Sequence, residues 1–189
     1  MSDNLVLLAL GANLFSSTGA PEAGLRAALR ALAAEGLPAC RVSRFWKTPA
    51  FPPGSGPDYV NAAAALRSAQ PAPALLAAAH RVEAALGRVR DGGRWGARVI
   101  DIDLLAVGDL VLPDAAEQDR WRALPPDQQQ RLTPDRLILP HPRLQDRGFV
   151  LAPLAEIAPQ WRHPRTGRTV AAMLAALEPA GLGGMAPLA

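Results

Sequence analysis

Hydrophobic positions along the chain follow two periodicities in turn, which predict alternating strands and helices. Residues 5–10 form a compact apolar run that ends at a Gly-Ala-Asn turn, which indicates a buried strand. Apolar residues then recur at helical spacing over 21–35, and Gly36 and Pro38 end that helix. Residues 40–46 alternate weakly between apolar and polar, so we expect a second strand there.

The pattern repeats in the next part of the chain. Residues 48–57 are rich in proline and glycine and predict a loop, and 58–66 predict a third strand. An apolar stripe predicts a helix over 71–88, and 99–107 is the most strand-like segment of the chain. The order is therefore βαββαβ. It predicts an α+β fold with a ferredoxin-like antiparallel sheet and helices packed on one face.

The remaining sequence adds helical segments to this core. Residues 113–134 are polar and read as a surface insertion with a short helix. Residues 149–158 and 169–177 predict extra C-terminal helical segments, and the chain from about 178 onward reads as a loose tail. We find no internal repeat or interdomain linker, so we expect a single domain over 1–189.

Composition narrows the class of protein. The chain is 49% hydrophobic and 20% charged, which is typical of a globular domain. Its net charge of +3 does not call for a nucleic-acid partner. A single cysteine, Cys40, fits a reducing compartment, and no apolar run is long enough for a membrane span or a signal sequence. We therefore expect a cytoplasmic protein with no membrane partner and no obligate protein partner.

Two acidic residues on the most strand-like segment form the sharpest chemical feature. Asp101 and Asp103 are two positions apart, so a strand points both carboxylates to one face. Two acids on an apolar strand repel each other and are costly to desolvate, and a bound cation removes that conflict. Mg²⁺ favours a few carboxylates together with phosphate oxygens. The alternative is an edge strand with two solvated acids.

An arginine- and glycine-rich stretch, 88–98, comes just before the acidic pair. Arginines near a divalent cation suggest a polyphosphate ligand, and the glycines suggest a loop that closes over it. A plain exposed connection is the alternative. Strict alternation puts Arg98 on the face opposite Asp101 and Asp103, unless the strand begins with a twist or bulge.

Other candidates are weaker when taken alone. Asn61 can read the edge of a heterocycle, and Tyr59 and Phe149 can stack on a flat ring. Taken alone, these residues are better explained by ordinary core packing of the two aromatic rings and by a backbone-capping role for Asn61. His141 lies between two prolines and could contact a nucleotide, but its spacing from the other histidines does not indicate a metal site.

Together these segments resemble a known family. The motifs are LGANL at 10–14, WKTP at 46–49, PDYVNA at 57–62, RWGARVIDIDLL at 94–105, PHPR at 140–143, RGFVL at 147–151 and PLAEIAP at 153–159. In this order they resemble the 6-hydroxymethyl-7,8-dihydropterin pyrophosphokinase (HPPK) family, from about residue 5 to 159.

The resemblance implies a reaction and a set of site residues. ATP would donate its β,γ-diphosphate to the pterin hydroxymethyl oxygen in folate biosynthesis, with two Mg²⁺ ions held by Asp101 and Asp103. The implied catalytic residues are Asp101, Asp103, Arg88 and Arg98. Those implied on the nucleotide side are Arg88, Arg94, Trp95, Arg98, Leu104, Arg136, His141 and Arg147. Those implied on the pterin side are Thr48, Pro49, Phe51, Tyr59, Asn61 and Phe149.

The sequence departs from the family pattern in three places. Ala12 replaces the usual serine, Ala97 replaces the usual proline, and the insertion at 113–134 is longer than the common short turn. Two other functions stay open at this point. One is another Mg-dependent nucleotide-using transferase on the same fold, and the other is a non-enzymatic ligand-binding domain, because fold alone does not determine activity.

Overall fold

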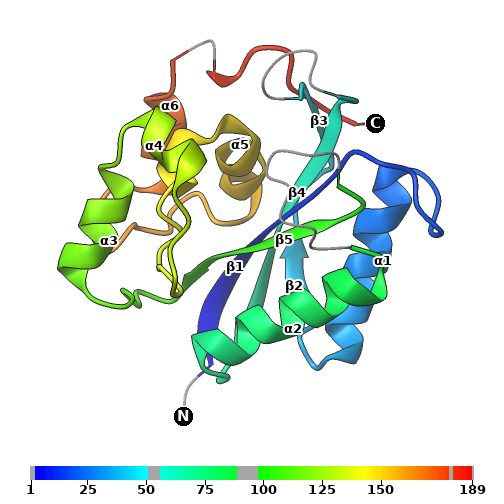
Figure 1. The fold of residues 1–189 in the computed structure, drawn as a ribbon, viewed down its shortest axis with the longest axis horizontal. Coiled ribbons are helices and arrows are strands. Elements are labelled where there is room, and N and C mark those ends of the chain that lie inside the picture. The colour runs from blue at the N-terminus through cyan, green and yellow to red at the C-terminus, as the bar shows by residue number, and fades with distance from the viewer. Residues whose placement is uncertain (1–2, 51–55, 89–97, 179–180, 189) are drawn as a thin grey trace.

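The computed structural model describes residues 3–50, 56–88, 98–178 and 181–188, and Figure 1 shows the arrangement of their elements. In chain order these elements are β1 (Asn4–Ala12), α1 (Pro21–Ala34), β2 (Ala39–Val42), β3 (Trp46–Thr48), β4 (Tyr59–Ser68), α2 (Ala72–Ala85), β5 (Asp101–Val107), α3 (Ala115–Arg122), α4 (Pro126–Arg131), η1 (Leu144–Asp146), α5 (Gly148–Ile157), α6 (Val170–Ala175) and β6 (Ala186–Pro187). No helix of the described ranges is long and apolar enough to cross a membrane.

The described strands form one antiparallel sheet. Its order is β5-β1-β4-β3-β6, and β2 pairs with another part of β4. The predicted second strand is divided into β2 and β3 because the Ser43 hydroxyl accepts the Ala63 N–H, at 2.9 Å, and interrupts the backbone ladder. The α+β class and the antiparallel sheet are confirmed.

Helices cover both faces of the sheet, whereas the sequence pattern predicted one covered face. Val6 and Leu8 of β1 are buried in a core with α1 and α2. Leu7, between them, is buried in a second core with α5 and α6. Figure 1 shows the two pairs of helices on opposite sides of the strands. The uninterrupted apolar run of β1 follows from burial on both sides.

The polar insertion folds into two helices, α3 and α4. The Asp114 carboxylate caps α3 by accepting the Glu117 N–H at 2.9 Å. Gln118 is fully buried and Trp121 is nearly so, so one face of α3 packs against the body of the protein. The insertion thus contains the expected helical structure, and one face of α3 is buried although the segment as a whole is polar.

The C-terminal tail is partly ordered, in contrast to the loose tail expected from about residue 178. Residues of β6 pair with Trp46 and Lys47 of β3. The Leu188 N–H also donates to the Phe45 carbonyl at 2.7 Å. Backbone pairing with a distant strand orders this glycine-rich segment, and Figure 1 places the C-terminus beside β3.

Candidate active site

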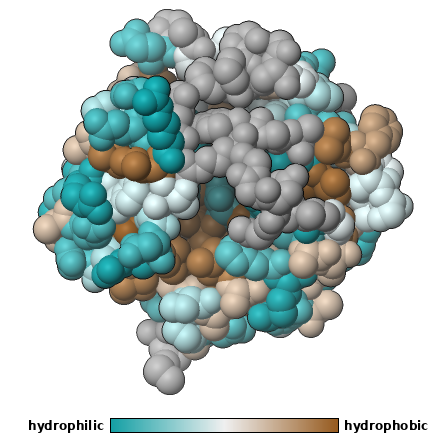
Figure 2. Space-filling view, in the orientation of Figure 1, coloured by the Kyte–Doolittle hydropathy of each residue, from teal (hydrophilic) through white to brown (hydrophobic). Residues whose placement is uncertain are grey.

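A cavity of about 660 Å³ opens at one side of the sheet, between the strands, α2 and the segment that follows the insertion. Figure 2 shows a hollow near the centre of this face, with hydrophobic residues at its base. The residues of its wall that the sequence had singled out are Thr48, Pro49, Tyr59, Asn61, Arg98, Asp101, Asp103, Leu104, Arg136, His141, Arg147 and Phe149. Phe51, Arg94 and Trp95 lie outside the described residues.

Strand β5 brings the two acidic side chains to the same wall of the cavity. Asp101 pairs with Gly11 of β1, and Asp103 pairs with Ala9. Ile102, between them, points to the opposite side and is buried in the core beneath α2. The side-by-side arrangement of the carboxylates is the one that strand spacing predicts.

Three arginines of the described residues lie beside the acidic pair. Arg88 Nη1 contacts Asp101 Oδ1, and Arg98 Nη1 contacts Asp101 Oδ2. Arg147 Nη1 lies 3.6 Å from Asp103 Oδ2. β5 begins at Asp101 rather than at residue 99, so Arg98 precedes the strand. Strand alternation therefore does not apply to Arg98, and it shares the site with both acids.

Burial dominates the electrostatics of Asp101. Desolvation and then the neighbouring Asp103 carboxylate raise the pKa of Asp101, although Arg98 and Arg88 act to lower it. An ionised Asp101 is therefore under-compensated in the protein alone. Additional positive charge beside the pair would stabilise it.

Glu83 supports this corner of the site, and we did not select it from the sequence as a site residue. Its side chain is 1% exposed and accepts the Ile102 N–H at 2.7 Å. The same carboxylate oxygen contacts Arg88 Nη1. One buried acid on α2 thus fixes both the start of β5 and an arginine of the site. The sequence did contain a signal for it: Glu83 directly follows Val82, a residue of the apolar stripe of the predicted helix, so it lies near the buried face of that helix.

A fixed amide lies on the neighbouring strands. Asn61 is buried on β4, and its Nδ2 donates to Thr48 Oγ1 at 2.7 Å. Asn61 is paired with Gly11, where a Cβ would lie 2.6 Å from Asn61 Oδ1. The glycine therefore leaves the space that the amide occupies. Burial also raises the pKa of the nearby Tyr59 hydroxyl.

His141 is held as a neutral imidazole. Its Nδ1 accepts the Arg143 N–H at 3.1 Å, so the ring proton is on Nε2. Burial, then the Arg147 and Arg143 charges, lower the pKa of His141 to about 3. Arg147 in turn lies over the ring of Phe149, with 5.5 Å between its guanidinium carbon and the ring centroid.

Several residues of the cavity wall escaped sequence analysis. They are Leu76 and His80 of α2, Trp121, Gln129 and Leu132 of the insertion, and Arg143. Leu76 and His80 are four residues apart, one position after the core stripe of α2, so helical spacing could have paired them. No local pattern indicated the insertion residues, because their approach to the cavity depends on contacts with distant segments.

The carboxylate pair fits a magnesium site. Among the described residues, no group of three or more His, Cys, Asp or Glu side chains could hold a metal ion. Asp101 and Asp103 are two carboxylates on one wall, and Mg²⁺ commonly takes one or two protein carboxylates and completes its shell with phosphate and water oxygens. Because burial and Asp103 raise the pKa of Asp101, a cation bound beside the pair would stabilise its ionised form.

Comparison with known sequences assigns the chain to a family. Residues 7–159 match the family model described as 7,8-dihydro-6-hydroxymethylpterin-pyrophosphokinase (HPPK). A Methylorubrum extorquens protein named 2-amino-4-hydroxy-6-hydroxymethyldihydropteridine pyrophosphokinase is 38% identical over 178 residues, which are 93% of this chain and 94% of that protein. The protein of the same name from Pseudomonas aeruginosa is 37% identical, with 90% of each chain covered.

Other relatives are longer than this chain. The Synechocystis protein of the same name is 38% identical over 135 residues, which cover 71% of this chain but 58% of its own. The solved structure of Plasmodium falciparum HPPK-DHPS superimposes with a TM-score of 0.63 at 12% identity, over 93% of this chain and 45% of that one. The predicted resemblance is confirmed: the chain belongs to the 7,8-dihydro-6-hydroxymethylpterin pyrophosphokinase family and is an enzyme of the diphosphotransferase class.

Proposed function

We propose that the chain transfers the β,γ-diphosphate of ATP to the hydroxymethyl oxygen of 6-hydroxymethyl-7,8-dihydropterin, giving AMP and the pterin diphosphate for folate synthesis. The observation that carries this proposal is the position of Asp101 and Asp103 in one cavity wall, with Arg98 and Arg147 beside them. Membership of the pyrophosphokinase family supports the same reaction.

The acidic pair and its arginines would receive the triphosphate. Mg²⁺ bound by Asp101 and Asp103, two ions in the family pattern, would neutralise phosphate charge and favour ionisation of the attacking hydroxyl. Arg98 and Arg147 can bind phosphate oxygens through charge-assisted hydrogen bonds. Arg88 is shared between Glu83 and Asp101, so it holds the carboxylate in place.

His141 and Arg136 would act on the nucleotide side. Neutral His141 carries its proton on Nε2 and can donate a hydrogen bond to a phosphate or ribose oxygen without adding charge. Arg136 is exposed at the cavity wall, where its charge can attract the anionic nucleotide.

The amide of Asn61 and the ring of Phe149 would hold the pterin. Asn61 is fixed by Thr48 and can present a directional acceptor to the edge of the heterocycle. Phe149 lines the same cavity and can stack on the flat ring. Holding the two substrates on either side of the carboxylates would bring the hydroxyl to the β-phosphorus.

A product assay tests the reaction. With ATP, Mg²⁺ and the pterin, we expect AMP that depends on the pterin, and we expect EDTA to abolish it and excess Mg²⁺ to restore it. ADP or free pyrophosphate as the product would instead indicate a different nucleotide-using transferase. Binding of either substrate with no product would favour a ligand-binding domain.

This function needs only the two small substrates as partners. Neither nucleic acid nor a membrane is required by the site, and the single cysteine supports a reducing compartment such as the cytoplasm.

A further inference from the structure

Residues of the insertion at 113–134 line part of the cavity, and the proposed reaction does not yet assign them a role. Trp121, Gln129 and Leu132 of the insertion line the cavity together with Leu76 and His80 of α2. Leu132 is 46% exposed, although it is a large hydrophobic side chain. A leucine that lines a cavity and is still largely exposed is suited to contact with a ligand.

Strand order places this end of the cavity beyond the phosphate-binding residues. Asn61 and Thr48 lie on β4 and β3, Gly11 lies on β1, and the carboxylates lie on β5, the edge strand of the sheet. The insertion follows β5 in the chain, and α2 packs against β5. A ligand whose polyphosphate lies at the carboxylates and whose acceptor substrate lies near Asn61 would extend its other end past β5.

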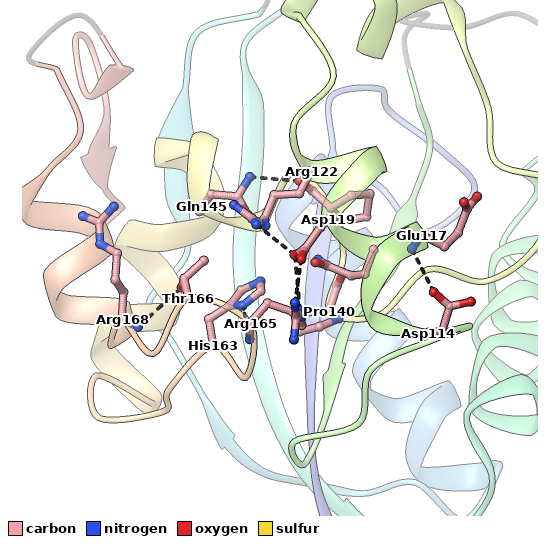
Figure 3. A network of polar contacts seen from close by, with 12 residues as sticks. Asp114, Glu117, Asp119, Arg122, Pro140, Gln145, His163, Arg165, Thr166 and Arg168 are labelled. Carbon is pink, nitrogen blue, oxygen red and sulfur yellow. Dashed lines mark hydrogen bonds and ion pairs between the residues drawn. The ribbon is translucent and has the colours of Figure 1, made fainter.

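The insertion is anchored firmly enough to serve as a wall. Gln118 Nε2 donates to the Pro140 carbonyl at 3.2 Å in the buried interior, directly before His141. Asp119 forms an ion pair with Arg165, at 2.6 Å, and another with Arg122. Figure 3 shows this network between α3 and the turn that contains His163 and Arg165.

The chemistry of this end suits an adenine ring. Leu76, Leu132 and Trp121 offer apolar surface for the faces of a flat base. Gln129 Nε2 donates to the Leu124 carbonyl at 2.6 Å, which fixes the amide and leaves Oε1 as its acceptor for a ligand. An amide oxygen accepts from the exocyclic amino group of adenine but repels the carbonyl oxygen that guanine has at the same position.

We infer that the insertion is part of the nucleotide site, with Leu132 covering the base and Gln129 selecting adenine through its 6-amino group. This inference rests on the proposed function, because it assumes that ATP occupies the cavity. It gives the long insertion of this chain a role in substrate specificity.

Nucleotide selectivity tests the role of Gln129. Binding of α,β-methylene ATP, and of the same analogue with purine or guanine as its base, is measured by calorimetry without pterin. The wild type should prefer adenine over purine by about fivefold, the value of one hydrogen bond. Gln129→Ala should reduce this preference to less than about twofold, while Gln128→Ala, an exposed neighbour in α4, should keep it. An unchanged preference in Gln129→Ala would overturn the assignment.

A second variant tests the wall itself. Leu132→Asp should raise the KM for ATP about tenfold and leave the KM for the pterin unchanged, because it removes apolar contact and adds a negative charge near the nucleotide. Asp127→Asn, also on the exposed surface of α4, is the control. An unchanged KM for ATP in Leu132→Asp would overturn the inference that Leu132 contacts the nucleotide. Absence of pterin-dependent AMP in the wild type would instead overturn the proposed function, while the calorimetric comparison would still report on the base.

Discussion

Two aspartates of this chain each lie between two arginines, yet their carboxyl pKa values move in opposite directions. Asp101 contacts Arg88 and Arg98, and its pKa is raised. Asp119 contacts Arg165 and Arg122, and its pKa is lowered, first by the hydrogen bond from Arg165. Ion-pair count alone therefore does not determine the charge state that the fold favours.

The difference lies in burial and in neighbouring charge. Asp101 is desolvated and faces a second carboxylate, Asp103, so its two arginines do not fully compensate the ionised form. Asp119 is partly exposed, so water screens its charge, and among the described residues no neighbouring acid contributes to its pKa shift. The first arrangement is typical of a site that receives a further cation, and the second is typical of a structural anchor.

The largest expected effect is on catalysis at Asp101. Asp101→Asn should lower kcat about a thousandfold or more, because it removes a charge that would hold the divalent ion. Its Tm should change little, because the charge partner that Arg88 and Arg98 lose is offset by removal of a carboxylate whose ionised form the fold disfavours. Rates of AMP formation at saturating Mg²⁺ and a thermal melt measure both quantities. Asp109→Asn, in an exposed turn, is the control, and near-normal turnover of Asp101→Asn would contradict the comparison.

Glu83 holds Arg88 beside Asp101, so its substitution should affect the stability of the protein as well as the rate of the reaction. Glu83→Gln keeps an acceptor for the Ile102 N–H but removes the charge opposite Arg88. We expect the free energy of unfolding in urea to fall by about 2 kcal/mol, because Arg88, only 15% exposed, loses the charge of one of the two carboxylates that it contacts in the described part of the chain. Glu35→Gln removes a comparable pair with Arg81 at the surface and should leave stability nearly unchanged. Equal losses in the two variants would argue against the importance of burial.

Asp119 should show the reverse of Asp101. Asp119→Asn should lower the Tm and keep kcat within about twofold of the wild type, since it loosens the anchor of α3 without touching the carboxylate pair. The KM for ATP should rise slightly if α3 helps to form the cavity wall. A large fall in kcat would show that the surface network takes part in catalysis.

The pH dependence of this stability has a defined sign. The folded-state pKa of Asp119 is below its ordinary value of 3.8, so its contribution is complete above that value and is lost as the pH falls further. The Tm difference between wild type and Asp119→Asn should therefore be constant from neutral pH to about pH 5 and shrink in stronger acid. A difference that grows on acidification would contradict the lowered pKa.

The smallest expected effect is on the pH dependence of ATP binding at His141, because burial keeps this imidazole uncharged. With its pKa lowered to about 3, His141 stays neutral across the physiological range. The ratio of KM for ATP between His141→Gln and the wild type should therefore be constant between about pH 5 and 8. A step in that ratio near pH 6.5, the ordinary pKa of histidine, would show that the imidazole titrates in the working protein.

The spacing of apolar and acidic residues along the sequence predicted much of the fold and part of the candidate site. The two-residue spacing of Asp101 and Asp103 predicted carboxylates on one face, and the structure has them in one cavity wall. The apolar stripes predicted α1 and α2, and the ordered motifs indicated the family that the sequence comparison confirms. The roles that the family pattern suggests for individual residues stay predictions.

Other features depended on contacts that sequence spacing does not report. Glu83 reaches β5 from α2, Gly11 makes room for Asn61, and β6 pairs with β3 from the far end of the chain. The insertion was polar enough to predict exposure, yet the fold turns Gln129 and Leu132 toward the cavity. Residue spacing records which side chains share a face of one strand or helix. The pairing of faces from different elements is set by packing across the whole chain, and that pairing decided the shape and charge of the site.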